Sequence, residues 1–499
     1  MRILRSMYTN LTGCVRLMGE ISEPFNISIG LRQGCNLSPQ LFNLYIDDLA
    51  RALLAANNSP VTLNGTKIAC LLYADDMLLL SSTASGLQRN LNILNEYCTK
   101  WQLVVNTQKT KILLFNKRSN MTSFSIGKFE LENVDEYTYL GITLHKTGSF
   151  KKAIKNLSIK AERAYFAVKA VFRQNSLNPR LFIKLFDALV RPILLYCCEV
   201  WGGFEWKRQK KKEITLFEQL MLADNFCYEK INIKLCKQSL KIPRRASNLA
   251  CRMEVGRYPL MKTICVAMLK YYKRTKNLAQ DDLVAYAMMS QNSKPNNSFG
   301  SLTYCQCCEL MLKDLDIIDN LITNEPDSKA SLNRYGKMVK RKCEDKYRVV
   351  HREMLNSVQT ASKLEMYKTI KREFCYSNYL NIRNPMLNIL TKFRMSLHWL
   401  PIERGRYIRP KIPRHERLCL FCNLDVGSEF HVFMECKHKL VEDLRSKYLN
   451  KMNDICPPLR ILPNEQKFIY IMSCCDRDLI PLTIDWVKYC NEIHKNNPA

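Results

Sequence analysis

The chain has 499 residues, 47% of them apolar and 24% charged, which excludes an intrinsically disordered protein. Lys and Arg total 76 against 46 Asp and Glu, so the formal charge is +30 and a polyanionic partner, nucleic acid first, is expected. No run of about 18 apolar residues occurs, and the N-terminus lacks the apolar stretch of a signal peptide. We therefore expect no membrane association and an intracellular protein of the nucleus and cytoplasm.

The charge is distributed unevenly along the chain. Residues 1–150 carry 14 basic and 11 acidic side chains, whereas residues 151–499 carry 62 and 35. The first part is therefore predicted to be a near-neutral folded core, and the remainder a basic surface for nucleic acid.

Residues 1–145 have the pattern of a mixed α/β region. Ser38 as N-cap and Pro39 in the first turn predict a helix that continues to about Ala56, because leucines recur at helical spacing. Two short apolar runs, 68–72 and 77–80, flank a polar break and predict a hairpin of buried strands. A helix over about 86–101 and a strand over 111–115 follow.

The rest of the chain is mostly helical in pattern. Residues 288–302 are polar and rich in helix breakers, which favours a linker. The basic run at 207–212 is a candidate nuclear import signal or phosphate contact, and a solvated loop is the alternative. The predicted regions are 1–145 (α/β), 146–287 (helical), 288–302 (linker), 303–414 (basic helical), 415–440 (Cys/His segment) and 441–499 (helical tail).

Asp75 and Asp76 are adjacent acids at the predicted hairpin turn. An ordinary polar turn explains them, because Asp favours turns. A divalent-metal site is the more specific alternative, since hard cations such as magnesium bind carboxylate oxygens. A turn on a rigid sheet would hold those oxygens in fixed positions. Two such ions can clamp the attacking and leaving oxygens of a phosphoryl transfer.

A glycine-flanked segment, Gly30–Gly34, precedes the helix at Ser38. Gly34 permits close approach of the backbone to a ligand, Arg32 can meet a phosphate, and Gln33 can meet a base edge.

These segments resemble the motifs of reverse transcriptases from non-LTR (LINE-type) retrotransposons, in the family's order. Tyr73–Asp76 resembles the catalytic motif of the palm, the central domain of right-hand-shaped polymerases. The other palm motifs are resembled by 30–49, 106–111 and 139–142, and further similar segments are 185–187, 191–196, 199–202, 254–260 and 390–394.

The resemblance implies an RNA template and a DNA primer or target as partners, and Mg2+ as cofactor. It implies that Asp75 and Asp76 are catalytic and hold the magnesium. The nucleotide- and template-binding residues would be Arg32, Gln33, Gly34, Tyr73, Lys109 and Lys111, and the primer-side residues Tyr139, Leu140 and Gly141.

One element of the family pattern is missing. The family's first catalytic carboxylate lies upstream of the glycine–glutamine segment, but residues 1–46 contain no Asp. Asp47 and Asp48 are better explained as a solvated helix face. The expected fold is thus an α/β palm remnant of the right-hand polymerase type, with the fingers missing, followed by mostly helical thumb and C-terminal regions.

The segment 415–440 has the spacing of a small metal site. Cys419, Cys422, His431 and Cys436 form a C-x2-C-x8-H-x4-C pattern, whose thiolates and imidazole suit a structural tetrahedral Zn2+. Chance placement of buried thiols is the alternative, and His438 is an alternative ligand. The family resemblance, which includes a C-terminal Cys/His motif, favours a zinc knuckle.

Two functions therefore remain open. The chain is predicted to be a reverse transcriptase (RNA-directed DNA polymerase, a nucleotidyltransferase) of a non-LTR retrotransposon, a transposable element, truncated and inactive alone. The alternative is a non-catalytic remnant that binds RNA or DNA.

Overall fold

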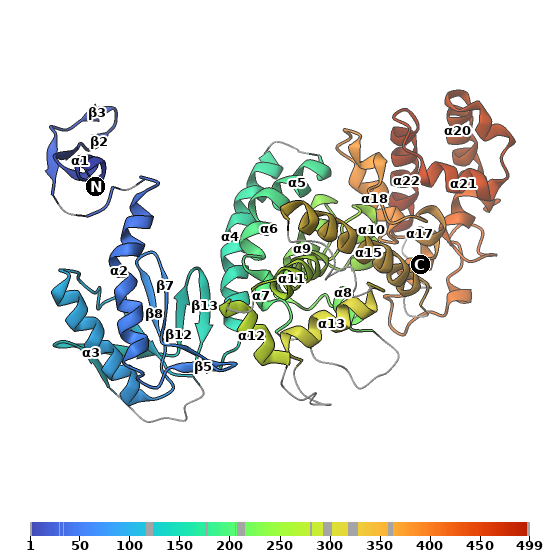
Figure 1. Ribbon diagram of the computed structural model, residues 1–499. Coiled ribbons are helices and arrows are strands. Elements are labelled where there is room, and N and C mark those ends of the chain that lie inside the picture. Colours follow the sequence, from blue (N-terminus) through green and yellow to red (C-terminus); the bar gives the residue numbers. More distant parts are fainter. Residues whose placement is uncertain are drawn as a thin grey trace. The chain divides into compact units, whose positions relative to one another are not determined.

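A computed structural model describes residues 2–28, 30–32, 34–115, 123–174, 178–204, 206, 215–279, 282–292, 302–317, 328–357 and 363–496 (Figure 1). The chain divides into two compact units. The first comprises Met1–Tyr137 and His145–Gly148, and the second Thr138–Leu144 and Ser149–Ala499. The basic run at 207–212 lies outside the described residues.

The first unit contains short helices and small sheets, as the predicted α/β pattern requires. Strands β10, β11 and β9 form one sheet in that order, with β11 antiparallel to β10 and parallel to β9. The pairs β1–β4, β2–β3, β5–β6 and β7–β8 are antiparallel, and β12 pairs with β13. The elements of the first unit are α1 (Arg2–Tyr8), β1 (Leu11–Gly13), β2 (Arg16–Leu17), β3 (Glu20–Ile21), β4 (Phe25–Ile27), α2 (Ser38–Ala55), β5 (Val61–Leu63), β6 (Thr66–Ile68), β7 (Cys70–Tyr73), β8 (Asp76–Leu79), α3 (Ala84–Lys100), β9 (Lys111–Leu113), β10 (Phe124–Ile126) and β11 (Phe129–Val134). Strands β12 (Glu136–Tyr139) and β13 (Ile142–His145) belong partly to each unit.

The core of the first unit lies between α2, α3 and the strands. Helix α2 contributes Leu49 and Leu53 and helix α3 contributes Leu91 and Leu94, each pair at the helical spacing that puts both side chains on one face. Thr83 starts α3, since its hydroxyl accepts a hydrogen bond from the backbone N–H of residue 86 at 3.1 Å.

Helix α2 begins at Ser38 but without the predicted side-chain cap. The Ser38 hydroxyl donates to the carbonyl of Arg32 at 3.0 Å and shares a hydrogen bond with the Tyr8 hydroxyl at 2.9 Å. No helix N–H donates to it, and the residue before the helix is Leu37. The expected N-cap was therefore wrong, because the hydroxyl is used to fasten the preceding segment instead.

The second unit is almost entirely helical, which confirms the predicted helical pattern of this part. Its elements are α4 (Lys151–Gln174), α5 (Pro179–Leu189), α6 (Arg191–Leu194), α7 (Cys198–Trp201), α8 (Leu216–Met221), α9 (Cys227–Ser239), α10 (Asn248–Glu254), α11 (Leu260–Lys276), α12 (Leu283–Asn292), α13 (Tyr304–Asp314), α15 (Lys329–Asn356), α17 (Glu365–Ile370), η1 (Asn378–Asn381), α18 (Leu387–Arg394), α19 (Pro401–Arg404), η2 (Arg414–Glu416), η3 (His431–Glu435), α20 (Lys439–Ile455), η4 (Pro457–Ile461), α21 (Asn464–Ser473) and α22 (Leu479–Asn496).

Helix α12 corrects the start of the predicted linker. The helix continues through Asn292, so residues 288–292 are helical, and residues 293–301 lie outside the described part. Met288 packs against the neighbouring hydrophobic core, and this contact outweighs the polar composition of the residues after it.

Two hydrophobic cores fill the second unit. The first gathers side chains of α4, α5, α9, α11, α13 and α15, including Tyr165, Phe186 and Tyr272. The second gathers side chains from the end of α9 to α22, including Phe393, Phe433 and Trp486. Within the described ranges, no helix combines the length and apolar character needed to cross a bilayer.

A buried ion pair joins distant parts of the second core. Glu254, at the end of α10, is fully buried and accepts a hydrogen bond from Arg394 Nε of α18 at 3.0 Å. The Tyr367 hydroxyl of α17 donates to the second oxygen of Glu254 at 2.7 Å. Despite the opposing effect of burial, the Arg394 charge and the tyrosine hydroxyls hold the pKa of Glu254 below its usual value. One carboxylate thus ties three helices together.

Candidate functional site

The β7–β8 hairpin presents two exposed carboxylates at its tip. Its strands pair Cys70 with Leu79 and Tyr73 with Asp76, which confirms the predicted hairpin, but the strands are half-buried and not buried as expected. Ala74 adopts a left-handed conformation with φ of +52°, and this tight turn places Asp75 and Asp76 in solvent. Neither carboxylate side chain has a hydrogen bond or ion pair among the described residues, so both are available to a cation.

The other acids that could have joined them are engaged elsewhere. Asp47 forms an ion pair with Arg51 on the same helix at 2.6 Å. Asp48 is not simply solvated, because it accepts a short hydrogen bond from the Tyr97 hydroxyl of α3. Burial, reinforced by that carboxylate, raises the pKa of Tyr97. Asp48 therefore fastens α2 to α3, a role that the sequence pattern does not signal.

The predicted nucleotide-contacting segment lies next to α1. Arg32 is exposed and donates weakly to the carbonyl of Met7 at 3.4 Å. Gly34 has a φ of +82°. Gln33 lies outside the described residues, and Tyr73 is 64% exposed beside the carboxylates.

The two predicted phosphate-binding lysines differ in their surroundings. Lys111 Nζ forms an ion pair with Glu132 of β11 at 2.7 Å. The backbone N–H of Lys109 donates to the side chain of Asn106 at 3.1 Å, which shapes the turn before β9. The Lys109 ammonium has no carboxylate within ion-pair distance in the described ranges, so it is the better placed of the two to meet a phosphate.

The predicted primer-side residues form the β12–β13 turn. Leu140 and Gly141 both have positive φ values, +46° and +82°. The Tyr196 hydroxyl donates to the carbonyl of Leu140 at 3.0 Å, and its ring lies 3.1 Å from the position of a Cβ on Gly141. Tyr139 is half-buried in β12. The aromatic ring thus supports the turn, and the positive φ and the nearby ring both favour glycine at position 141.

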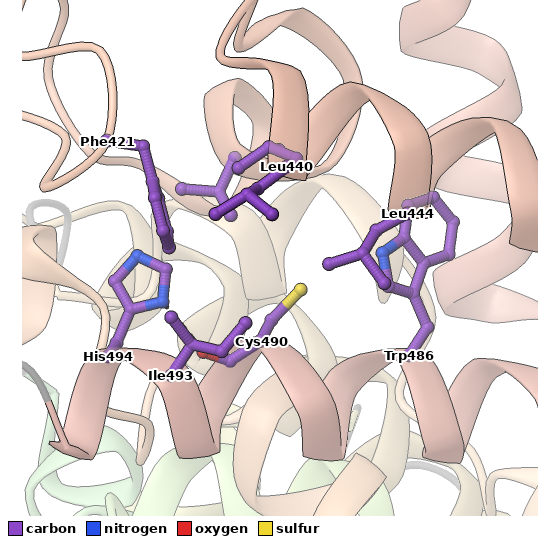
Figure 2. Close-up of a pocket in the computed structure, with 9 residues that line it drawn as sticks. Phe421, Leu440, Leu444, Trp486, Cys490, Ile493 and His494 are labelled. Atoms are coloured by element: carbon purple, nitrogen blue, oxygen red, sulfur yellow. Dashed lines mark hydrogen bonds between the residues drawn. The ribbon is translucent and has the colours of Figure 1, made fainter.

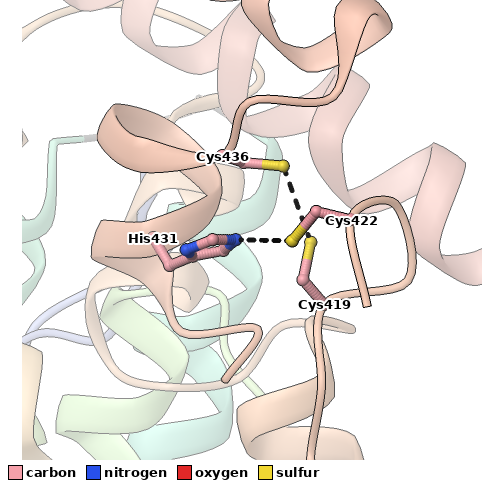
Figure 3. A group of neighbouring side chains, drawn as sticks. All are labelled: Cys419, Cys422, His431 and Cys436. Carbon is pink, nitrogen blue, oxygen red and sulfur yellow. Dashed lines mark hydrogen bonds between the residues drawn. The ribbon is translucent and has the colours of Figure 1, made fainter. Parts of the chain in front are cut away.

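Cys419, Cys422, His431 and Cys436 converge as the spacing predicts (Figure 3). Their ligand atoms all lie within 4.8 Å of one another. The Cys419 and Cys436 sulfurs are 3.8 Å apart, and Cys422 Sγ lies 3.3 Å from His431 Nε2. Metal–sulfur bonds of about 2.3 Å in a tetrahedron would put two sulfurs about 3.8 Å apart, so the spacing fits a four-ligand metal centre.

Local backbone structure brings the four ligands together. A bridge between Leu418 and Val426 closes a small loop that carries both Cys419 and Cys422. Asn423 makes the turn with a φ of +51°. The π-helical turn η3 starts at His431, and its i to i+5 hydrogen bond places Cys436 one turn above that histidine.

The electrostatics of the four side chains also fit a cation. Burial raises the pKa of Cys419 to about 12 and that of Cys436 above its usual value, so the neutral thiols would persist without a compensating charge. Burial also opposes ionisation of Cys422, but N–H donors of the loop lower its pKa overall. His431 Nδ1 is buried and has no hydrogen-bond partner, with Asp425 at 3.8 Å and Glu435 at 3.9 Å. Both distances are longer than a hydrogen bond, so the two carboxylates lie near the ring without holding it.

The alternative ligand His438 is not part of the group of candidate metal ligands found among the described residues. Its ring packs on Phe421, and Phe421 also meets the His494 ring edge-on with centroids 5.1 Å apart. A cavity of about 10 Å³ remains between the Phe421 ring, helix α20 and helix α22 (Figure 2). That space holds at most about one water, so the Cys/His loop is packed firmly onto the helices.

An arginine supports the last ligand. Arg445 of α20 donates to the carbonyl of Met434 at 2.7 Å and makes a short hydrogen bond to the carbonyl of Cys436. This satisfies carbonyls that the end of η3 leaves free. The spacing of the cysteines gives no hint of this residue.

Comparison with known proteins finds similarity in the N-terminal part of the chain. Residues 1–144 match the family model described as reverse transcriptase (RNA-dependent DNA polymerase). The chain is 29% identical over 212 residues to the probable RNA-directed DNA polymerase from transposon BS of Drosophila melanogaster, which covers 40% of this chain and 23% of that protein. It is 25% identical over 210 residues to the RNA-directed DNA polymerase from mobile element jockey of the same species, covering 40% and 22%.

A third relative belongs to another element. The Pol polyprotein from type-1 retrotransposable element R2 of Popillia japonica is 27% identical over 218 residues, covering 40% of this chain and 34% of that protein. This chain therefore spans less than two fifths of the length of each of these relatives. The family model matches residues 1–144, and the alignments of 210 to 218 residues with these relatives cover more of the chain than the model does.

Proposed function

We propose that this chain, whose first 144 residues form a reverse transcriptase domain of the non-LTR retrotransposon type, binds an RNA template and a DNA primer or target. The observation that carries the proposal is the exposed carboxylate pair at the hairpin tip, inside the matched region. Asp75 and Asp76 would hold Mg2+, which when bound supplies charge neutralisation for phosphoryl transfer.

The remaining palm residues take supporting roles in this proposal. Arg32 and Lys109 would contact phosphates, and Gln33, Gly34 and Tyr73 would line the nucleotide and template site. The turn at Leu140 and Gly141, supported by Tyr196, would contact the primer. Lys111 would stabilise the sheet through Glu132 more than it contacts nucleic acid.

We further propose that the 499-residue chain alone extends a primer poorly or not at all. Two-metal chemistry of this family uses three carboxylates, but residues 1–46 contain no Asp, and Asp47 and Asp48 are engaged by Arg51 and Tyr97. The test is template-dependent primer extension with magnesium by the chain and its Asp75→Ala variant. Extension by the chain that is lost in the variant would overturn this part of the proposal.

Nucleic-acid binding without chemistry is the second candidate function. It is favoured by the 62 basic and 35 acidic residues after residue 150. A protein that contacts phosphates releases counterions, so affinity for RNA should fall by about a thousandfold or more between 50 and 200 mM salt. Binding that is absent at low salt, or independent of salt, would contradict it.

The Cys/His group would hold Zn2+ as a structural ion in this proposal, since the tetrahedral spacing and thiolate-rich donor set suit that metal. Metal analysis of the purified chain should find about one zinc per chain, and Co2+ substitution should give thiolate-to-cobalt absorption bands. Cys436→Ser should lose the metal, whereas Cys475→Ser, an exposed cysteine outside the group, should retain it. Equal metal content in both variants would contradict the assignment.

A further inference from the structure

A second potential binding site lies in the C-terminal part of the second unit. A pocket with a volume of about 670 Å³ opens between the segment after α17 and helix α21. This volume lies within the range of ligand-binding pockets. Lys371, Arg372 and Ser377 line one wall, and Gln466 and Tyr470 line the other.

The first wall contains a buried cation that forms no ion pair with a carboxylate of the described residues. Lys371 is 9% exposed, and its ammonium donates to the carbonyl of Cys375 at 2.9 Å and contacts the sulfur at 3.2 Å. No carboxylate of the described residues lies within ion-pair distance of it. Glu254, the buried carboxylate of this core, is hydrogen-bonded by Arg394 and Tyr367, and the Lys371 charge acts on it only from beyond ion-pair distance and helps to lower its pKa. Because buried charges are normally paired, this ammonium indicates a site for an anion.

Two further groups on the same wall suit an anionic oxygen. The Ser377 side chain is 6% exposed, and its hydroxyl is buried without any hydrogen-bond partner. Arg372 is exposed and has neither an ion pair nor a hydrogen bond in the part of the chain that the structure describes. A hydroxyl, an ammonium and a guanidinium together form a donor set suited to phosphate. Glu373 also lines the pocket but is exposed.

The opposite wall offers an aromatic surface. Tyr470 of α21 lines the pocket and is 40% exposed, so part of its side chain is accessible to a ligand. Gln466 lies one helical turn before it and can donate to and accept from a base edge. A phosphate-binding wall that faces an aromatic ring is the arrangement by which proteins hold a nucleotide.

We propose that this pocket binds one nucleotide, with the phosphate at Lys371, Arg372 and Ser377 and the base stacked on Tyr470. The phosphate assignment stands on the unpaired buried groups alone. The choice of a nucleotide as the anion rests on the proposed nucleic-acid-binding function. The nucleotide can be free or part of a single strand, because both present the same phosphate and base.

The test compares binding of AMP and of the pentanucleotide rA5 to the full chain, by calorimetry and fluorescence anisotropy. Arg372→Gln removes an exposed pocket charge without disturbing the core, and Arg383→Gln removes the same charge from an exposed position outside the pocket. Tyr470→Ala removes the stacking surface and should weaken binding at least about fivefold. Lys371→Gln should weaken it similarly, with circular dichroism to verify folding.

Weaker AMP binding in the pocket variants, with Arg383→Gln unchanged, would support a site for free nucleotides. The same pattern for rA5 alone would support a nucleotide within a single strand. Binding of neither probe, equal losses for Arg372→Gln and Arg383→Gln, or no effect of Tyr470→Ala would overturn the proposal. A long RNA measured in parallel separates the two proposals, since its salt-dependent binding would persist if only the pocket assignment failed.

Discussion

Removing one partner of the buried Glu254–Arg394 pair should destabilise the second unit strongly. In Glu254→Gln the side chain keeps its shape and can still accept from Tyr367, but Arg394 is left as a buried cation only 2% exposed. Breaking a buried pair on one side costs about 3–5 kcal/mol, because the remaining charge loses its compensation. With a urea dependence of about 3 kcal/mol per M, the unfolding midpoint should fall by about 1–1.7 M.

The matched control removes both charges. The double variant Glu254→Leu with Arg394→Met leaves Tyr367 with its second acceptor, the Ala250 carbonyl at 3.1 Å, and should recover most of the loss. Urea titrations followed by far-UV circular dichroism measure both variants and the single Arg394→Met change. A decrease of less than about 0.3 M in Glu254→Gln, or a double variant no better than the singles, would refute the reasoning.

Two further perturbations test the same unit. Burial raises the pKa of Glu403 to about 7, so the folded state binds this proton more tightly than the unfolded state, whose pKa is 4.5, and stability is lost as pH rises through that interval. Glu403→Gln should therefore gain about 2–3 kcal/mol relative to the parent between pH 5 and pH 8, and parallel pH profiles of the urea midpoint would contradict this. Gly256→Ala should cost about 1–3 kcal/mol or more, because φ is +59° and the new Cβ would lie 2.6 Å from the backbone nitrogen of Tyr376. Gly148→Ala, in the first unit, has a similar φ of +70° with nothing within 4 Å, and thermal melts showing equal losses for both variants would contradict the steric explanation.

Features encoded by nearby residues could be predicted from the sequence. The helix from Ser38 follows from leucine spacing, the β7–β8 hairpin from two apolar runs, and the Cys/His group from a pattern that spans only residues 419–436. In each case the residues that determine the structure are close in sequence, so the periodicity and spacing of the residues predict the geometry.

Features set by distant contacts could not be predicted. The sequence predicted that Asp48 is a solvated acid, but in the fold it accepts a hydrogen bond from Tyr97. It predicted that Ser38 caps its helix, but the Ser38 hydroxyl is hydrogen-bonded to Arg32 and Tyr8. The local sequence around Lys371 also does not signal that it lacks an ion pair, because the buried carboxylate of this core, Glu254, pairs with Arg394, 140 positions further along the chain.

The second core has a consequence for how this protein is made. Its members run from Cys236 to Cys490, and α18 packs against α22 at the end of the chain. A ribosome adds about 5–20 residues per second, so α22 is synthesised on the order of ten seconds or more after α10. During that interval Glu254 and its apolar neighbours are without the C-terminal helices that enclose this core. Newly made chains should therefore depend on chaperones until the last helix has left the ribosome, and C-terminal truncations should aggregate.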